Sequence, residues 1–194
     1  MFPRKEFTAL QEAWDEAEQA IKIAEQVTGV AIVPSINELR YAGRKIIEAA
    51  QADDESTAGD ILRDARRDCF RAEHDAVDAT VSLMSRHLDL LASQVGLAAI
   101  GSVVPEIGRF RLDLSAAEAE IARSRGDRGS RAEVYDRLRT ANLPALKAVY
   151  DQIRVCEGDL IRDAEKRRRA QVLSLLVGVT GVAIGVIGLF AALF

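Results

Sequence analysis

A run of 24 residues at the end of the chain, 171–194, carries no charged side chain. A helix needs about 20 apolar residues to cross the roughly 30 Å hydrocarbon core of a bilayer, so this run is long enough to span a membrane with a modest tilt. A buried core helix of this length would normally keep a polar face. We therefore predict a C-terminal transmembrane helix over 171–194. It would make the chain a tail-anchored protein whose first partner is the lipid bilayer.

The segment before this run is strongly basic and contains Lys166, Arg167, Arg168 and Arg169. Lysine and arginine concentrate on the cytoplasmic side of membrane spans, and each attracts anionic lipid headgroups by ~1 kcal/mol near the surface. We expect 166–170 to be a juxtamembrane segment at the cytoplasmic (inner) membrane. The protein would cross it once, with its N-terminus in the cytoplasm. Residues 1–6 lack the apolar core of a signal peptide, so insertion is expected to depend on the C-terminal span.

Small residues recur within the run at steps of three and four, which places them on one face of a helix. Helices in lipid associate by close backbone approach, which small residues permit. We predict that the span self-associates and that the protein is a homo-oligomer. The alternative is that glycines are simply common in membrane helices. The predicted contact residues are Ser174, Gly178, Gly181, Gly185, Gly188 and Ala192.

The remainder of the chain is acidic, because the net charge of the 194 residues is −4 although four basic residues cluster before the span. An acidic body argues against a nucleic-acid-binding surface, which normally shows a clustered basic patch. Residues 1–165 are enough for one cytoplasmic domain with a core. Its only cysteines, Cys69 and Cys156, are expected to be free buried thiols.

Apolar residues of this domain recur at the three-four spacing of amphipathic helices, which predicts an all-α fold. We expect an antiparallel bundle of about five helices, including helices over 4–27, 35–50 and 57–94. Ser35 to Glu38 has the pattern of a capping box, which would start the second helix. The uncharged stretch 96–104 is expected to be a buried connection.

A proline divides the last part of the domain. A helix is expected to begin near Arg131, and Pro144 should bend or break it after about Ala141, because proline removes one backbone donor. Beyond Ala145 nothing is a strong helix stop. We therefore expect one rod to run from the bundle into the bilayer.

The richest cluster of functional side chains is expected where the second and third helices face each other. Arginine guanidinium groups there could bind a small anionic ligand in bidentate fashion, and a tyrosine could stack on it. The alternative is a solvated helix face with weak ion pairs. The candidate ligand-binding residues are Arg40, Tyr41, Arg44, Arg71 and Asp75.

No catalytic or metal-binding motif stands out, and we expect neither a metal nor another cofactor. One short pattern, Arg67-Asp68 followed by five residues and His74, resembles the Arg-x(4–6)-His signature of the helical HEPN-type ribonucleases. The spacing is the longest that the signature allows, and the resemblance covers eight residues. It implies that His74 moves a proton while Arg67 stabilises phosphate charge.

Three functions remain open from the sequence. The first is a non-enzymatic, self-associating, membrane-anchored bundle that binds a cytoplasmic protein or a small ligand. The second is a membrane-perturbing effector of a bacterial stress or anti-phage system. The third is a membrane-tethered HEPN-like ribonuclease.

Overall fold

The computed structural model describes residues 3–127 and 129–193, with side chains as far as residue 172 and at Ser174. Within these ranges the chain forms a bundle of helices without strands, which confirms the predicted all-α class. In chain order the elements are α1 (Arg4–Thr28), α2 (Val33–Ala50), α3 (Glu55–Val95), α4 (Leu97–Val103), α5 (Ile107–Gly126), α6 (Arg131–Arg137), the π-helical segment η1 (Leu138–Asn142) and α7 (Leu143–Leu193).

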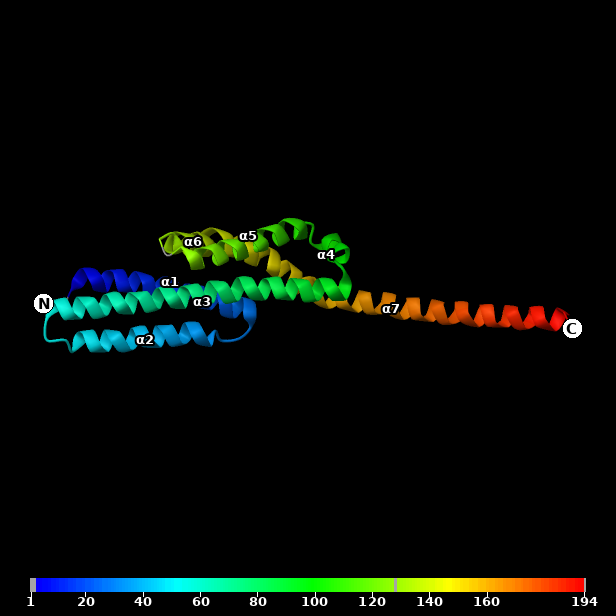
Figure 1. Cartoon of the computed structure of the whole chain (residues 1–194), viewed down its shortest axis with the longest axis horizontal. Helices are drawn as coiled ribbons and strands as arrows, with labels where there is room; N and C mark the ends of the chain where they lie inside the picture. The colour runs from blue at the N-terminus through cyan, green and yellow to red at the C-terminus, as the bar shows by residue number, and fades with distance from the viewer. Residues whose placement is uncertain (1–2, 128, 194) are drawn as a thin grey trace.

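Helix α3 is the centre of the bundle. It has 41 residues, and α1, α2, α5, α6 and the first part of α7 all pack against it (Figure 1). Asp54 caps its start, because the carboxylate accepts hydrogen bonds from the backbone N–H and the hydroxyl of Thr57, at 2.8 and 2.6 Å. The long helix therefore gives the other α-helices a common surface to pack on.

The core between α1 and α3 consists largely of small side chains. Ala17 and Ala24 of α1 are fully buried, as are Ala65, Ala72 and Ala76 of α3. Small side chains let two helix backbones approach closely, and a packed interior at this density leaves little room for larger residues. The alanines of α3 are thus part of the core.

Both cysteines are free thiols, as predicted. Cys69 is buried and Cys156 is half-buried. Burial, together with the neighbouring carboxylate of Asp68, raises the pKa of the Cys69 thiol to about 12. This thiol is therefore an unreactive core residue at neutral pH.

The predicted capping box is wrong. Helix α2 begins at Val33, with Pro34 in its first turn, and the cap residue Ile32 makes no side-chain capping bond. Proline fits a first turn because its missing N–H has no partner there, so the helix starts before Ser35. Ser35 instead lies buried inside the first turn, and Glu38 faces α3.

The junction before α7 follows from Pro144. The helix does not break but widens into η1 between α6 and α7. A proline in a helix clashes with the carbonyl four residues earlier, and one π-type turn relieves that clash. Figure 1 shows the resulting bend where the chain enters α7.

From Leu143 to Leu193 the backbone is one helix of 51 residues, as expected from the lack of a strong helix stop beyond Ala145. At 1.5 Å per residue it is roughly 75 Å long. Its first part lies in the bundle and its second part projects beyond it (Figure 1).

The membrane prediction falls on the last part of this helix. Among the residues that the structure describes, no helix is both long and apolar enough to cross a bilayer. The predicted span, 171–194, lies outside the residues whose side chains are described, apart from its first residues and Ser174. The same holds for the predicted contact residues Gly178, Gly181, Gly185, Gly188 and Ala192.

Candidate functional site

A polar cavity of about 410 Å³ lies between α3, the end of α5 and α6, and we call it the polar recess. It contains three of the residues that the sequence singled out, Arg71, His74 and Asp75. We therefore take it as the candidate functional site. Its full lining is Glu38, Arg71, His74, Asp75, Asp78, Arg125, Arg131 and Tyr135.

The spacing of residues on α3 creates one wall of the recess. Positions 71, 74, 75 and 78 recur at steps of three and four and therefore share a helix face. The opposite wall comes from Arg125 of α5 and from Arg131 and Tyr135 of α6, on either side of the α5–α6 connection. Asp127 orders that connection by accepting a bond from the Gly129 N–H at 2.9 Å and from the Ser130 hydroxyl at 2.8 Å.

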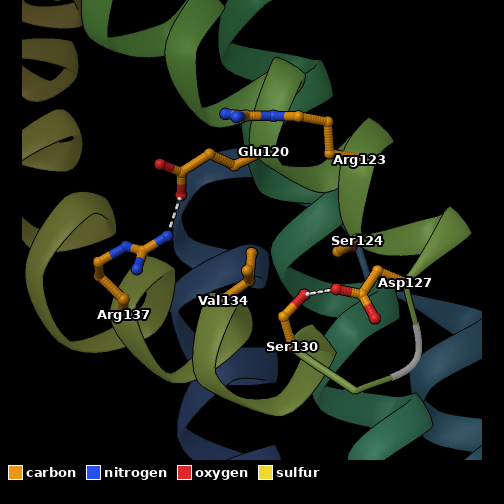
Figure 2. A pocket seen from close by; sticks show the side chains of 7 residues that line it. All are labelled: Glu120, Arg123, Ser124, Asp127, Ser130, Val134 and Arg137. Carbon is orange, nitrogen blue, oxygen red and sulfur yellow. Dashed lines mark hydrogen bonds and ion pairs between the residues drawn. The ribbon is translucent and has the colours of Figure 1, made fainter.

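A second hollow, of about 280 Å³, lies beside this connection (Figure 2). Its charged groups already have partners, since Glu120 and Arg137 form an ion pair at 2.8 Å. Arg123 donates from Nε to the Ala119 carbonyl of its own helix at 3.2 Å. This hollow is a less suitable binding site, because a ligand would have to break these contacts.

His74 is held in a neutral state inside the polar recess. Its ring stacks on Tyr135, with centroids 3.7 Å apart. Burial, and after it the positive charge of Arg131, lower the pKa of His74 to about 4, although Asp78 opposes the shift. At neutral pH the imidazole is therefore uncharged and acts as an aromatic packing surface.

Asp78 links α3 to both α5 and α6. The Tyr135 hydroxyl donates to Oδ1 of Asp78 at 2.7 Å, and the Arg125 guanidinium contacts Oδ2 at 3.0 Å. Burial and the bond to Asp78 raise the pKa of Tyr135. Arg131 donates to the carbonyls of Ser124 and Arg125, at 3.1 and 2.9 Å, and so closes the end of α5.

Asp75 differs from its neighbours, because it forms no hydrogen bond or ion pair with any residue that the structure describes. Its pKa is raised by burial first, then by the negative charges of Glu38 and Asp78, while Arg71 lowers it. A ligand can reach this carboxyl without displacing a protein partner. The free group of the recess is thus acidic rather than basic.

The other predicted ligand-binding residues lie elsewhere. On α2, Arg40 donates to Asn37 at 3.1 Å, Arg44 pairs with Glu48 at 3.2 Å, and Tyr41 is 56% exposed. None of these three lines the polar recess. The structure therefore brings Arg71 and Asp75 together but separates them from the arginines of α2.

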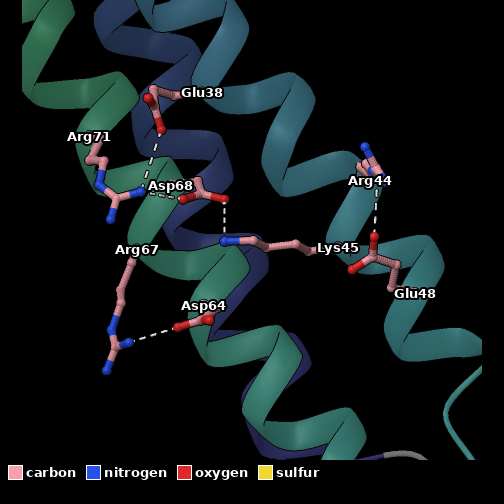
Figure 3. A network of polar contacts seen from close by, with 8 residues as sticks. All are labelled: Glu38, Arg44, Lys45, Glu48, Asp64, Arg67, Asp68 and Arg71. Carbon is pink, nitrogen blue, oxygen red and sulfur yellow. Dashed lines mark hydrogen bonds and ion pairs between the residues drawn. The ribbon is translucent and has the colours of Figure 1, made fainter.

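Figure 3 shows the ion pairs that connect α2 with α3. Asp68 is buried, with 2% of its side chain exposed, and it pairs with Lys45 of α2 at 2.8 Å. It also pairs with Arg71 at 2.6 Å, and Arg71 reaches Glu38 at 3.7 Å. These contacts occupy the place where we expected an anion, so Asp68 acts as the internal counterion.

An ion cluster around the buried Arg139 of η1 was not predicted. Arg139 is only 10% exposed and contacts Glu73 at 2.9 Å, Glu16 at 3.1 Å and Asp136 at 2.7 Å. Burial raises the pKa of Glu73, and Arg139 opposes that shift. The sequence does give a signal for this cluster, because Glu73 lies between Ala72 and Ala76, which are both fully buried on α3. A charged residue at that position needs a buried partner.

The resemblance to HEPN-type ribonucleases rests on Arg67 and His74, which the structure does not place together. Arg67 is exposed and pairs with Asp64 at 2.7 Å, as Figure 3 shows. His74 lies in the polar recess with a pKa of about 4. General acid–base catalysis works best with a pKa near the operating pH, so this geometry does not favour the nuclease.

The basic segment before the predicted span is exposed and lies beside the end of α3. Arg168 donates to the Gln94 carbonyl at 3.0 Å. Lys166 and Arg169 contact Asp163 and Glu165 of their own helix, at 3.3 and 3.8 Å. A cation near the last carbonyls of a helix is favourable, so Arg168 also helps to terminate α3.

In the described part of the chain, no group of three histidine, cysteine or acidic residues is arranged to hold a metal ion. A comparison of this chain with known protein families, with curated proteins and with solved structures finds no match.

Proposed function

We propose that this chain is a non-enzymatic, single-pass protein of the inner membrane. Its cytoplasmic helical bundle binds a partner, and the protein self-associates through the glycine-lined face of its span. The observation that carries this proposal is the continuity of α7 from Leu143 to Leu193. One helix joins the core of the bundle to the uncharged run, and the basic residues lie between them.

The first part of α7 is firmly packed in the bundle. Tyr150 and Ile153 are almost fully buried, and Leu146 and Leu160 are at most 7% exposed. His87 of α3 also contacts Glu157 of α7 at 3.0 Å. A displacement of the bundle would therefore move the rod as a unit, which supports a role in transmitting a binding event to the membrane.

The polar recess supports a protein partner more than a small anion. Its guanidinium groups are already engaged, because Arg71 pairs with Asp68 and Arg125 pairs with Asp78. An anion would have to compete with these carboxylates. Asp75 forms no hydrogen bond or ion pair within the described residues and could receive a basic or hydroxyl side chain from another protein.

Extraction of native membranes at alkaline pH tests the anchor. We expect the full chain to remain in the pellet. Val182→Arg combined with Ile187→Arg should release it, because each arginine near the centre of a span costs about 3 kcal/mol on insertion scales. Val155→Arg is the matched control, since Val155 is 83% exposed on the bundle part of the same helix. Recovery of the unaltered chain in the supernatant would disprove the anchor.

Crosslinking in native membranes tests self-association. A bifunctional amine reagent should give a ladder of oligomers, and Gly181→Leu with Gly185→Leu should remove it by blocking close backbone approach. Val179→Leu with Val186→Leu places leucines away from the face of small residues and should leave the ladder intact. Co-purification from mild detergent with and without Asp75→Asn then identifies a partner of the polar recess.

The other two functions stay predictions with distinct readouts. Membrane depolarisation that requires the span and disappears with Gly181→Leu and Gly185→Leu would favour the effector. RNA cleavage that is lost with His74→Ala while membrane attachment persists would favour the ribonuclease.

A further inference from the structure

The corner between α3 and α5 exposes apolar side chains, contrary to the buried connection that the sequence suggested. We call residues 94–112 the α4 corner. Ile100 and Val104 are buried, but Leu97 is 38% exposed, Val103 47% and Leu112 69%. Helix α4 is therefore amphipathic, with one side on the core and the other directed outward.

An apolar groove of about 440 Å³ lies on this corner, between the start of α4 and the first turns of α5. Its apolar walls include Leu97, Ile107 and Leu112, and Arg111 stands at its edge. Arg111 forms no ion pair with any described residue, whereas the nearby Arg109 pairs with Asp113 at 2.9 Å. The groove thus combines an apolar lining with one uncompensated positive charge.

The α4 corner lies beside the basic segment of α7, and this position indicates what can cover its apolar side chains. Arg168, in the basic segment, donates to the Gln94 carbonyl at 3.0 Å, and Gln94 is the first residue of the corner. The uncharged run begins at Gln171, only ~5 Å farther along the helix at 1.5 Å per residue. Figure 1 shows α4 at the end of the bundle from which α7 projects.

This distance matches the headgroup layer of a bilayer. The polar layer adds roughly 5–8 Å on each side of the hydrocarbon core, and basic residues accumulate there. If the uncharged run occupies the core, the α4 corner lies at the level of the headgroups. Exposed leucine and valine side chains at that depth can contact acyl chains, as interfacial helices do.

We propose that the α4 corner is a second membrane-binding surface, which rests on the proposed anchor function. Leu97, Val103 and Leu112 contact the acyl-chain boundary of the same leaflet, and Arg111 pairs with a phospholipid phosphate. The occupant of the groove is therefore a phospholipid of the bilayer that holds α7.

This contact has a structural consequence for the bundle. A single helix crossing the bilayer leaves the attached domain free to rotate about that helix. A second contact beside it fixes both the tilt and the rotation of the bundle. The polar recess, at the other end of α5, is then directed away from the lipid and toward the cytoplasm.

Depth-dependent quenching in the full-length protein tests this proposal. The protein, with Cys156→Ser to remove the half-buried thiol, is reconstituted into phosphatidylcholine vesicles containing phosphatidylglycerol. An environment-sensitive fluorophore is attached to Ala98→Cys on the α4 corner, which leaves the three apolar side chains in place. Separate samples carry it at Val172→Cys at the start of the uncharged run, or at Gln51→Cys at the opposite end of the bundle. The quencher is a lipid with a nitroxide at a shallow acyl position.

We expect residues 98 and 172 to be quenched several-fold more strongly than residue 51. Quenching at 172 without quenching at 98 would overturn the second surface while leaving the anchor intact. Absence of quenching at all three positions would overturn both proposals. Equal quenching at 51 and 98 would also overturn the second surface, because it would indicate adsorption of the whole bundle.

Variants of the corner supply the matched comparison. Leu112→Glu should reduce quenching at residue 98 several-fold, because a carboxylate resists transfer into the acyl region. Val155→Glu, at an exposed position away from the corner, should leave it unchanged. Arg111→Gln should weaken the dependence of quenching at 98 on phosphatidylglycerol. Quenching that is insensitive to both Leu112→Glu and Arg111→Gln would contradict the assigned contacts.

Discussion

The two ends of α5 differ in the kind of side chain that they expose and in whether those side chains have partners within the protein. At the C-terminal end, the guanidinium of Arg125 contacts Asp78, and Arg131 covers the last carbonyls. At the N-terminal end, Leu112 and the neighbouring Leu97 expose apolar surface without a protein partner in the described part of the chain. The same helix therefore presents a polar, internally neutralised end and an apolar end.

This difference is the one expected if the two ends have different surroundings. Paired charges are compatible with water, whereas covering apolar surface is worth roughly 25 cal/mol per Å² and favours another apolar phase. The arrangement agrees with the proposed orientation, in which the polar recess faces the cytoplasm and the α4 corner faces lipid. Four experiments test whether ion pairing and backbone conformation contribute to the stability of the bundle as the structure indicates.

The largest effect is expected from Arg139→Met, in the ion cluster of η1. Removing this buried guanidinium leaves Glu73, whose side chain is 6% exposed, without its counterion. Breaking a buried ion pair on one side costs ~3–5 kcal/mol, so the midpoint of urea unfolding should fall strongly. Arg137→Met, which removes a more exposed pair with Glu120, should cost less than ~1 kcal/mol. Equal effects of the two variants would show that burial does not decide the outcome.

The next largest effect is expected at the apolar end, from Gly96→Ala. Gly96 has a φ of +86°, a conformation that L side chains rarely adopt. Strain of this kind costs about 1–3 kcal/mol, which thermal unfolding can detect. Gly108→Ala is the control, because Gly108 lies in α5 and the space that an added methyl group would fill is open. It should be neutral or stabilising by up to ~1 kcal/mol. A neutral Gly96→Ala would mean that the turn is not constrained as the structure indicates.

Mild acidification should weaken the polar end through His74. The folded pKa of about 4 lies below the usual value near 6.5, so the unfolded chain binds a proton that the folded chain does not. Stability contributed by the neutral ring is complete above about pH 6.5 and falls as the pH decreases toward 4. After allowance for partial exposure, we expect a loss of about 1 kcal/mol by pH 5.

Urea unfolding of the unaltered chain and of His74→Gln across this range isolates the effect. His74→Gln should remove that part of the pH dependence. The raised pKa values of Asp75 and Glu73 act in the opposite direction at lower pH, because the folded state then binds protons more readily. An unchanged slope in His74→Gln would exclude His74 as the responsible group.

The smallest effect is expected from Arg44→Ala and Arg67→Ala. Both side chains are more than 70% exposed and pair only within their own helix, among the residues described. Each should change the free energy of unfolding by less than ~0.5 kcal/mol. A substantial loss of partner binding by Arg44→Ala, with unchanged stability, would revive the ligand site that the sequence predicted on α2.

The periodicity of apolar residues was sufficient to predict the helices, but it did not predict for every helix which face is buried. The seam of α3 through Leu62, Ala65, Cys69 and Ala72 is buried as expected. On α2, however, the large apolar side chain of Ile47 is 62% exposed. Alanines at 42 and 49 face the bundle instead, because the close approach to α3 leaves room only for small side chains there.

The candidate site was only partly accessible from the sequence. Arg71, His74 and Asp75 share one helix face, and this face is a consequence of local spacing. Arg125, Arg131 and Tyr135 come from more than 40 residues farther along the chain, and only the α5–α6 connection brings them to it. The pairing of Arg139 with Glu73 likewise depends on contacts between distant segments, joined through η1.

The sequence by itself determined the helical class and the continuous helix of α7, because these depend on short-range periodicity and on the absence of helix breakers. It also contains the uncharged run from which we predict the anchor. The tertiary structure alone decided which charges are buried, which arginines already have partners, and which apolar residues of the α4 corner remain exposed. Those properties depend on contacts between residues far apart in the chain, and local spacing does not encode them.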